Sequence, residues 1–158
     1  EIEKFFKMGT VFSNDLTLNA GSEGKYALLN LSNVDRRFVI QDDTNNRTSI
    51  LFKGGAKIDR WTIDGSFNYI KRKTSETNGG LYWDLLQSAP DIPVTRYKDY
   101  TENAYAWNIY YLNPYWSIKH NRSNYNSNYF NTTAAIGFKV NEHINLKYTG
   151  NIQNTNVD

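Results

Sequence analysis

The stretch "WTIDGSFNY", residues 61–69, alternates apolar and polar side chains along its whole length. The apolar residues on one side of an extended chain are Trp61, Ile63, Phe67 and Tyr69, and the polar residues on the other are Thr62, Asp64, Ser66 and Asn68. A period of two is typical of a β-strand that has one apolar and one polar face. This stretch therefore predicts a strand.

Five further segments alternate in the same way, although the second is blurred by Tyr26, Leu28 and Val34 on its polar side. They are residues 12–20, 25–35, 47–58, 129–140 and 144–153. Each is close to the length of about 10 residues with which a tilted strand crosses a bilayer, although a soluble sandwich uses strands of the same length. The six alternating segments together predict an all-β fold class.

The connections between these segments alternate between short and long. Residues 21–24, 59–60 and 141–143 are short turns, whereas 36–46 and 72–128 are long. In an antiparallel up-and-down meander, alternate connections lie on the same side. Outer-membrane barrels have short periplasmic turns and long extracellular loops. A loop of about 55 residues is also anomalous in a compact soluble domain.

Composition narrows the function classes. The 158 residues carry a net charge of +2 without a basic stripe, so nucleic acid is not expected as a partner. The chain has no Cys, which removes thiolate metal sites and Cys nucleophiles. No apolar run approaches the 20 or so residues of a membrane helix. The chain is nevertheless rich in aromatic residues, with 12 Tyr, 8 Phe and 4 Trp.

Three sequence elements carry a family resemblance. They are "FFKMGTVFSNDLTLNAGSEGKYALLNLSNVD", "LYWDLLQSAPDIPVTRYKDY" and "YYLNPYWSIKHNRSNYNSNYFNTTAAIGFKV". In this order and spacing they resemble the SusC/RagA family of TonB-dependent outer-membrane transporters of the Bacteroidota. Met8 stands where that family usually has Thr.

The resemblance implies that residues 1–158 are part of a transmembrane β-barrel of about 22 strands, the plugged class of barrel. The plug and the remaining strands would lie outside these residues, and 72–128 would be an extracellular loop. The implied function is import of oligosaccharides or peptides across the outer membrane of a Gram-negative bacterium. The implied partners are a SusD-like surface lipoprotein that lids the barrel, the TonB complex acting through the plug, the ligand, and membrane lipid.

The long connection contains a short apolar patch, "LYWDLLQSAPDIP". It predicts a helix over residues 81–87 that is stopped by Pro90 and Pro93. We expect Leu85, Leu86 and Ile92 to fold the loop onto the rim of the barrel.

Aromatic residues of the same connection are the candidate contacts to ligand or lid, because their rings bury area while hydroxyl and indole groups form hydrogen bonds. For any single residue, packing within the loop is the competing interpretation. The candidates are Trp83, Tyr97, Tyr100, Tyr105, Trp107, Tyr110, Tyr111, Tyr115 and Trp116.

Other polar groups do not form a recognisable catalytic or metal motif. Residues 42–46 contain Asp42, Asp43, Asn45 and Asn46 but lack the Gly and the closing Glu of an EF-hand, which favours a solvated polar turn. His120 and His143 have no zinc-binding context. A glycosidase pair among Asp84, Asp91, Asp99 and Glu102 would need a separation that sequence does not give. We expect no enzyme activity, cofactor or metal.

The rival hypothesis is a soluble secreted carbohydrate-binding module with a β-sandwich fold. The two hypotheses differ in what covers the apolar faces. Ile63, Phe67, Ile136 and Phe138 would contact lipid in a barrel and would be buried by a second sheet in a sandwich.

Overall fold

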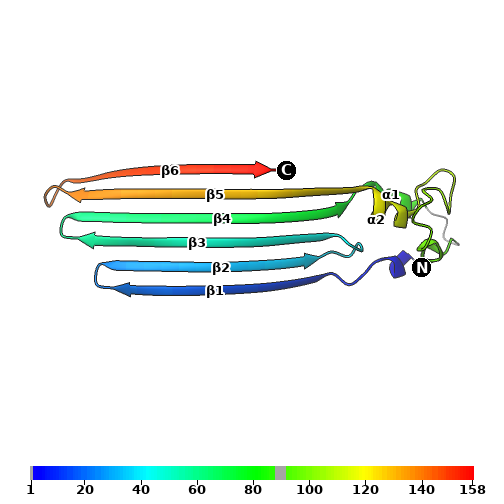
Figure 1. Cartoon of the computed structure of the whole chain (residues 1–158), viewed down its shortest axis with the longest axis horizontal. Helices are drawn as coiled ribbons and strands as arrows, with labels where there is room; N and C mark the ends of the chain where they lie inside the picture. Colours follow the sequence, from blue (N-terminus) through cyan, green and yellow to red (C-terminus); the bar gives the residue numbers. More distant parts are fainter. Residues whose placement is uncertain (1, 88–91) are drawn as a thin grey trace. The chain divides into compact units, whose positions relative to one another are not determined.

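The computed structural model describes residues 2–87 and 92–158, and in these residues it contains one six-stranded antiparallel sheet (Figure 1). The strands follow one another in the sheet in chain order, which confirms the predicted all-β meander. They are β1 (Thr10–Ser22), β2 (Lys25–Arg37), β3 (Thr44–Ile58), β4 (Trp61–Thr77), β5 (Arg122–Lys139) and β6 (Asn145–Val157).

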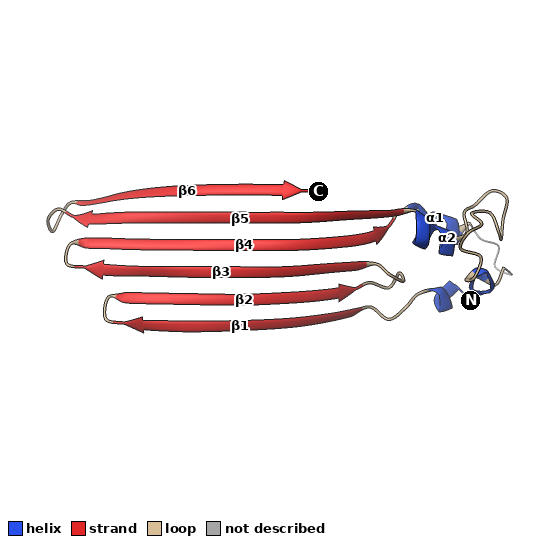
Figure 2. Cartoon of the chain, viewed as in Figure 1, coloured by secondary structure: helices blue, strands red, loops and turns tan. Residues whose placement is uncertain are grey.

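Helical elements are short (Figure 2). They are the 3-10 helices η1 (Ile2–Phe5) and η2 (Val94–Tyr97), and the α-helices α1 (Gly80–Leu86) and α2 (Pro114–His120). No helix in the described part of the chain is both long and apolar enough to cross a membrane.

Most strands run further than predicted, so both of the long connections are shorter than predicted. The β4–β5 connection covers residues 78–121 instead of 72–128, and the β2–β3 connection covers 38–43 instead of 36–46. The added parts include "KTSET" in β4 and "RSNYNSN" in β5, which are polar on both faces and give no alternation. Backbone pairing continues there regardless, with Ser127 opposite Val157 in the register of β5 and β6.

The three short turns are confirmed. Gly24 in the β1–β2 turn has φ +71°, which a residue without a Cβ adopts at no steric cost. Asp59 begins the two-residue β3–β4 turn with φ +50°. In the β5–β6 turn the Asn141 side chain accepts hydrogen bonds from the backbone N–H groups of His143 and Ile144, both at 2.9 Å.

The chain divides into two compact units. The first, which we call the loop unit, comprises the described residues of 1–12, 35–46 and 73–125. The second, the sheet unit, comprises residues 13–34, 47–72 and 126–158. The buried hydrophobic residues of the described chain all belong to the loop unit: Phe5, Ile40, Leu81, Leu85, Val94, Trp107, Tyr115 and Ile118.

The sheet unit leaves its apolar face uncovered. Ile63 is 48% exposed, Leu146 is 61% exposed, and Phe67 and Ile136 are exposed as well. Phe138 is half-buried because its ring packs on that of Trp61, with the centroids 4.5 Å apart. The described residues form no second sheet that could bury this face.

The opposite, polar face is joined by hydrogen bonds between strands. Asn30 donates to Thr17 at 2.7 Å, and Asn151 donates to Thr133 at 2.8 Å. Tyr26 explains the blurred pattern of its strand: its hydroxyl donates to Asp64 at 2.9 Å, and its ring lies where a side chain on Gly55 would be. An aromatic ring that covers a glycine on a neighbouring strand fixes the register of a sheet.

Candidate functional site

The loop unit is built around an apolar core that residues from distant parts of the sequence share. Phe5 of η1 packs edge-on against Tyr115 of α2, with the ring centroids 5.1 Å apart. Ile40, from the β2–β3 connection, belongs to the same cluster of buried residues. Three separate segments therefore hold the long connection in one conformation.

Helix α1 presents one apolar side to this core and another to the surroundings. Leu81 and Leu85, four residues apart and so on the same side of the helix, are each 2% exposed. Trp83 and Leu86 point away, and Trp83 is 61% exposed. A helix is therefore present where one was predicted over 81–87, and Leu86, expected to fold the loop onto the rim of the barrel, is exposed in the loop unit.

The ends of the apolar patch are only partly described. Ile92 packs against the core of the loop unit, and Pro93 directly precedes η2. Pro90, predicted to stop α1, and Asp91, a candidate carboxylate, lie outside the described residues.

Asn113 organises the second half of the connection. It is fully buried, and its side-chain oxygen accepts a hydrogen bond from the Tyr115 N–H at 3.1 Å, which caps the N-terminus of α2. Its side-chain amide donates to the carbonyl oxygens of Tyr97 and Tyr100, at 3.3 and 3.0 Å. One side chain therefore joins α2 to the last residue of η2 and to the segment that follows it.

Arg122 and Asp43 form a nearly buried ion pair at 3.0 Å, with side chains 14% and 9% exposed. The Asp43 carboxylate also accepts from the backbone N–H and the hydroxyl of Thr77, at 2.9 and 2.8 Å. Arg122 donates as well to the Asp42 and Ile118 carbonyl oxygens, at 2.6 and 3.0 Å. The turn predicted to be solvated is thus a buried anchor at Asp43, because a cation from β5 neutralises its charge.

A second ion pair joins Glu102 to α2. The Lys119 ammonium donates to Glu102, and this hydrogen bond together with the charge of Lys119 lowers the pKa of the Glu102 carboxyl. His120 lies 3.5 Å from the same carboxylate, and its ring contacts the Thr101 carbonyl oxygen at 3.1 Å. Lys119 lies in the last turn of α2, where positive charge is favoured.

Burial changes the acidity of two further groups. Burial raises the pKa of the Asp84 carboxyl in α1, and a hydrogen bond from the backbone of Leu112 partly opposes that rise. Burial also raises the pKa of the Tyr115 hydroxyl. Within residues 2–87 and 92–158, no three His, Asp or Glu side chains gather closely enough to hold a metal ion.

The nine aromatic candidates fall into three groups. Trp83, Tyr100, Tyr105 and Tyr110 are exposed, and Tyr110 is the most open of them at 78%. Tyr97, Tyr111 and Trp116 are half-buried. Trp107 and Tyr115 are each 8% exposed, and the Trp107 indole donates to the Tyr111 carbonyl oxygen at 3.1 Å. Trp107 and Tyr115 thus pack in the core and offer little surface to a ligand.

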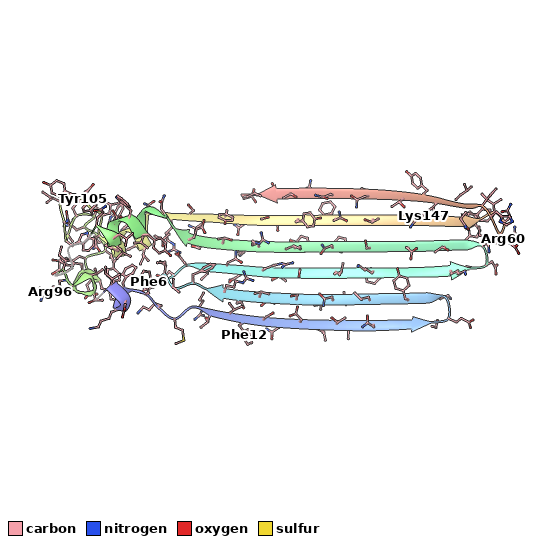
Figure 3. The ribbon with its side chains drawn as sticks, turned by 180° about the vertical axis from the view of Figure 1, so that it is seen from behind. Phe6, Phe12, Arg60, Arg96, Tyr105 and Lys147 are labelled. Carbon is pink, nitrogen blue, oxygen red and sulfur yellow. The ribbon has the colours of Figure 1, made fainter. Side chains whose placement is uncertain are left out.

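Two Asn side chains shape the exposed aromatic segments. Asn103 accepts a hydrogen bond from the Tyr105 N–H at 3.0 Å, and Asn108 accepts one from the Tyr110 N–H at 2.7 Å. Such Asx turns fix the backbone just before each tyrosine. The Tyr105 side chain projects away from the ribbon of the loop unit (Figure 3).

Three exposed apolar residues of the β4–β5 connection were not among the predicted contacts to ligand or lid. They are Tyr82, Leu86 and Ile109. Helical spacing could have found the first two, because they do not share the side of α1 occupied by Leu81 and Leu85. With Trp83 and the exposed tyrosines they give the loop unit rings and aliphatic groups that can cover a flat apolar face, and hydroxyls that can bond polar groups.

Comparison of the sequence with protein-family models and with curated proteins finds no match.

Proposed function

We propose that this chain forms part of the wall and outer loops of a TonB-dependent outer-membrane transporter that resembles the SusC/RagA family. The proposed cargo is an oligosaccharide or a peptide. The observation that carries the proposal is a single antiparallel meander whose apolar face is exposed, in a chain whose buried hydrophobic residues, among those described, all lie in the loop unit.

The apolar parts of the strands have the length that a bilayer requires. In β4 the apolar face runs over residues 61–69 and is followed by Lys71 and Lys73 on the same face. In β5 it runs over residues 130–138 and is preceded on that face by Asn126 and Asn128. Each apolar part spans nine residues, and a tilted transmembrane strand needs about 9–11.

Exposure of this face to water would be unfavourable. Leu16, Ile63, Leu146 and Ile152 all lie open on the sheet unit, and apolar area in water is costly in proportion to its size. Contiguous apolar surface of this kind is typical of a membrane or protein contact. Contact with lipid removes the cost without a second sheet.

An aromatic pair stands where a membrane interface is expected. Trp61 is the first residue of β4, directly after the β3–β4 turn, and its ring packs on Phe138 near the end of β5. Aromatic residues at strand ends form the girdles of outer-membrane barrels.

In this proposal the polar face lines the interior of the barrel, where a plug outside residues 1–158 would carry the contact to the TonB complex. The exposed aromatic residues of the loop unit would meet the ligand or a SusD-like lipoprotein. Trp83, Tyr100, Tyr105 and Tyr110 are the leading candidates because their side chains are accessible. No catalytic step is proposed.

Fractionation of source cells tests the proposal. An antibody raised against residues 78–121 should detect an outer-membrane band that requires detergent and has a mass of roughly 100 kDa, as a barrel of about 22 strands implies. A water-soluble band near 18.3 kDa would contradict it. Testing that soluble protein for sugar binding would then examine the carbohydrate-binding alternative.

A further inference from the structure

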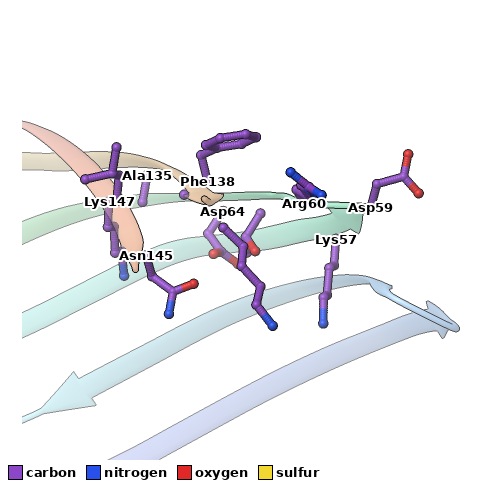
Figure 4. Close-up of a pocket in the computed structure, with 12 residues that line it drawn as sticks. Lys57, Asp59, Arg60, Asp64, Ala135, Phe138, Asn145 and Lys147 are labelled. Carbon is purple, nitrogen blue, oxygen red and sulfur yellow. The ribbon is translucent and has the colours of Figure 1, made fainter. Parts of the chain in front are cut away.

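A hollow of about 310 Å³ opens on the polar face of the sheet unit, beside the β3–β4 turn (Figure 4). Its base is formed by residues with small side chains, Thr62 on β4 with Ala135 and Gly137 on β5. A Cβ on Gly137 would lie 3.6 Å from the Thr62 Cβ, so these two positions face the same side. The hollow exists because Ala135 and Gly137 leave the space above β4 and β5 unfilled.

Long cationic side chains surround this base. Lys57 of β3, Lys139 of β5 and Lys147 of β6 line the hollow, and Arg60 lines it from the turn. In Figure 4 the side chains of Lys57 and Asn145 extend to one side of the sheet, while the Phe138 ring extends to the other. The Asp59 and Arg60 side chains of the turn extend toward the Phe138 side in the same view, so the positive charge of the hollow comes from lysines on three strands.

These cations are not neutralised by the chain itself. In the described part of the protein, none of the four forms an ion pair or a side-chain hydrogen bond. The two carboxylates of the hollow are Asp59 and Asp64, and Asp64 already accepts the Tyr26 hydroxyl. Asp59 and Arg60 extend to the opposite side of the sheet, so three lysines and one carboxylate, Asp64, leave an excess of two positive charges on the polar face.

We propose that this hollow binds a small oxyanion with two negative charges, such as phosphate or a dicarboxylate. Ammonium groups bind phosphate and carboxylate oxygens as mobile point charges. The flexible, solvent-exposed lysines make the site weak, with Kd on the order of 1 mM. The proposal rests on the sheet unit alone and is independent of the transport function.

Titration calorimetry tests this site on the purified protein. Sodium phosphate and sodium succinate are each titrated against sodium chloride at matched ionic strength, because diffuse charge screening responds to ionic strength alone. We expect heat of binding from one or both dianions beyond that of chloride. Phosphate binding identifies the phosphate class, and succinate binding alone identifies the dicarboxylate class.

Substitutions of residues that line the hollow test whether the anion binds there. Lys57→Gln and Lys147→Gln should each weaken binding about two- to fivefold, as loss of one exposed charge contact does, and the double variant about tenfold. Lys53→Gln is the matched control, because Lys53 lies on the same strand and polar face as Lys57 but outside the hollow. Ala135→Leu fills the hollow without changing charge and should also weaken binding.

Two results would overturn the proposal. One is that phosphate, succinate and chloride all give the same heat on titration at matched ionic strength. The other is a loss of affinity in Lys53→Gln as large as in Lys57→Gln, which would mean that general surface charge attracts the anion.

Discussion

Asn113 joins two parts of the long connection, since its side chain caps α2 and bonds two carbonyl oxygens at once. Sequence reasoning noted the segment "NPYW" but did not predict α2 from it. The signal was present, because Asn at the N-cap followed by Pro at the first helical position is a common helix start. The bonds to Tyr97 and Tyr100 had no such signal, because they join positions 16 and 13 residues away.

Asn113→Ala should loosen this part of the loop unit. Loss of an N-cap and of two buried hydrogen bonds costs about 2 kcal/mol, which accelerates local hydrogen exchange roughly 30-fold. Exchange mass spectrometry of peptides covering residues 97–118 measures it. Asn103→Ala is the control, because Asn103 is exposed and holds one turn only. Equal acceleration in both variants would refute the role of Asn113.

The raised pKa of Asp84 makes the loop unit sensitive to pH in a definite direction. Between the ordinary pKa of 3.8 and the higher pKa in the folded protein, the folded carboxyl holds its proton while the unfolded one has lost it. Stability is therefore lost as pH rises through this window and stays lower above it.

Asp84→Asn removes this titration and should keep the Leu112 N–H partnered through the amide oxygen. We expect the variant to gain protection from hydrogen exchange relative to the native protein as pH rises from 3.8, with no difference below it. Comparison of the two proteins at each pH cancels the intrinsic pH dependence of exchange. A difference that grows as pH falls would contradict the assignment.

At the scale of elements, alternation predicted the six strands and their order but not their full length. The pattern is carried by residues such as Ile63 and Phe67, whose side chains differ sharply from those of their neighbours. It fails in "KTSET" and "RSNYNSN", where polar side chains lie on both faces and hydrogen bonds of the backbone and of side chains continue the strand. Hydrogen bonds such as Tyr69 to Asn128, at 3.0 Å, join β4 and β5 where the β5 pattern has become polar.

Substitution of Gly55 tests how closely β2, β3 and β4 pack in this register. A Cβ at this position would overlap the Tyr26 ring and the Asp64 carboxylate and would lie 3.0 Å from the Ile63 carbonyl oxygen. Gly55→Ala should therefore destabilise the sheet by about 1–3 kcal/mol, as overpacking does. Unfolding in denaturant measures the change.

Gly150→Ala is the matched control for that substitution. Gly150 lies in β6, and an added Cβ there would meet no atom within 4 Å. It should be neutral or slightly stabilising, because alanine lowers the entropy of the unfolded chain. If the two variants were equally stable, the packing of Tyr26 over Gly55 would not be important for stability.

At the scale of the whole chain, the sequence predicted which segment holds the candidate contacts but not which of their side chains are exposed. The aromatic richness of the long connection pointed to the right segment, yet sequence could not separate the exposed Tyr110 from the buried Trp107. That separation depends on a core that Phe5, Ile40 and Leu81 build from distant segments. Hydrophobic periodicity reports on neighbours along the chain and carries no information about such contacts.

The central claim is that the apolar face of the sheet lies against lipid, and spin labels on the two faces of β4 test it most directly. Phe67→Cys and Asn68→Cys give neighbouring sites on opposite faces in a chain that has no other Cys. With the protein in lipid vesicles, the label at 67 should collide with oxygen dissolved in the bilayer, and the label at 68 with a water-soluble nickel complex. A label at 67 that is accessible to the nickel complex and not to oxygen would contradict the account.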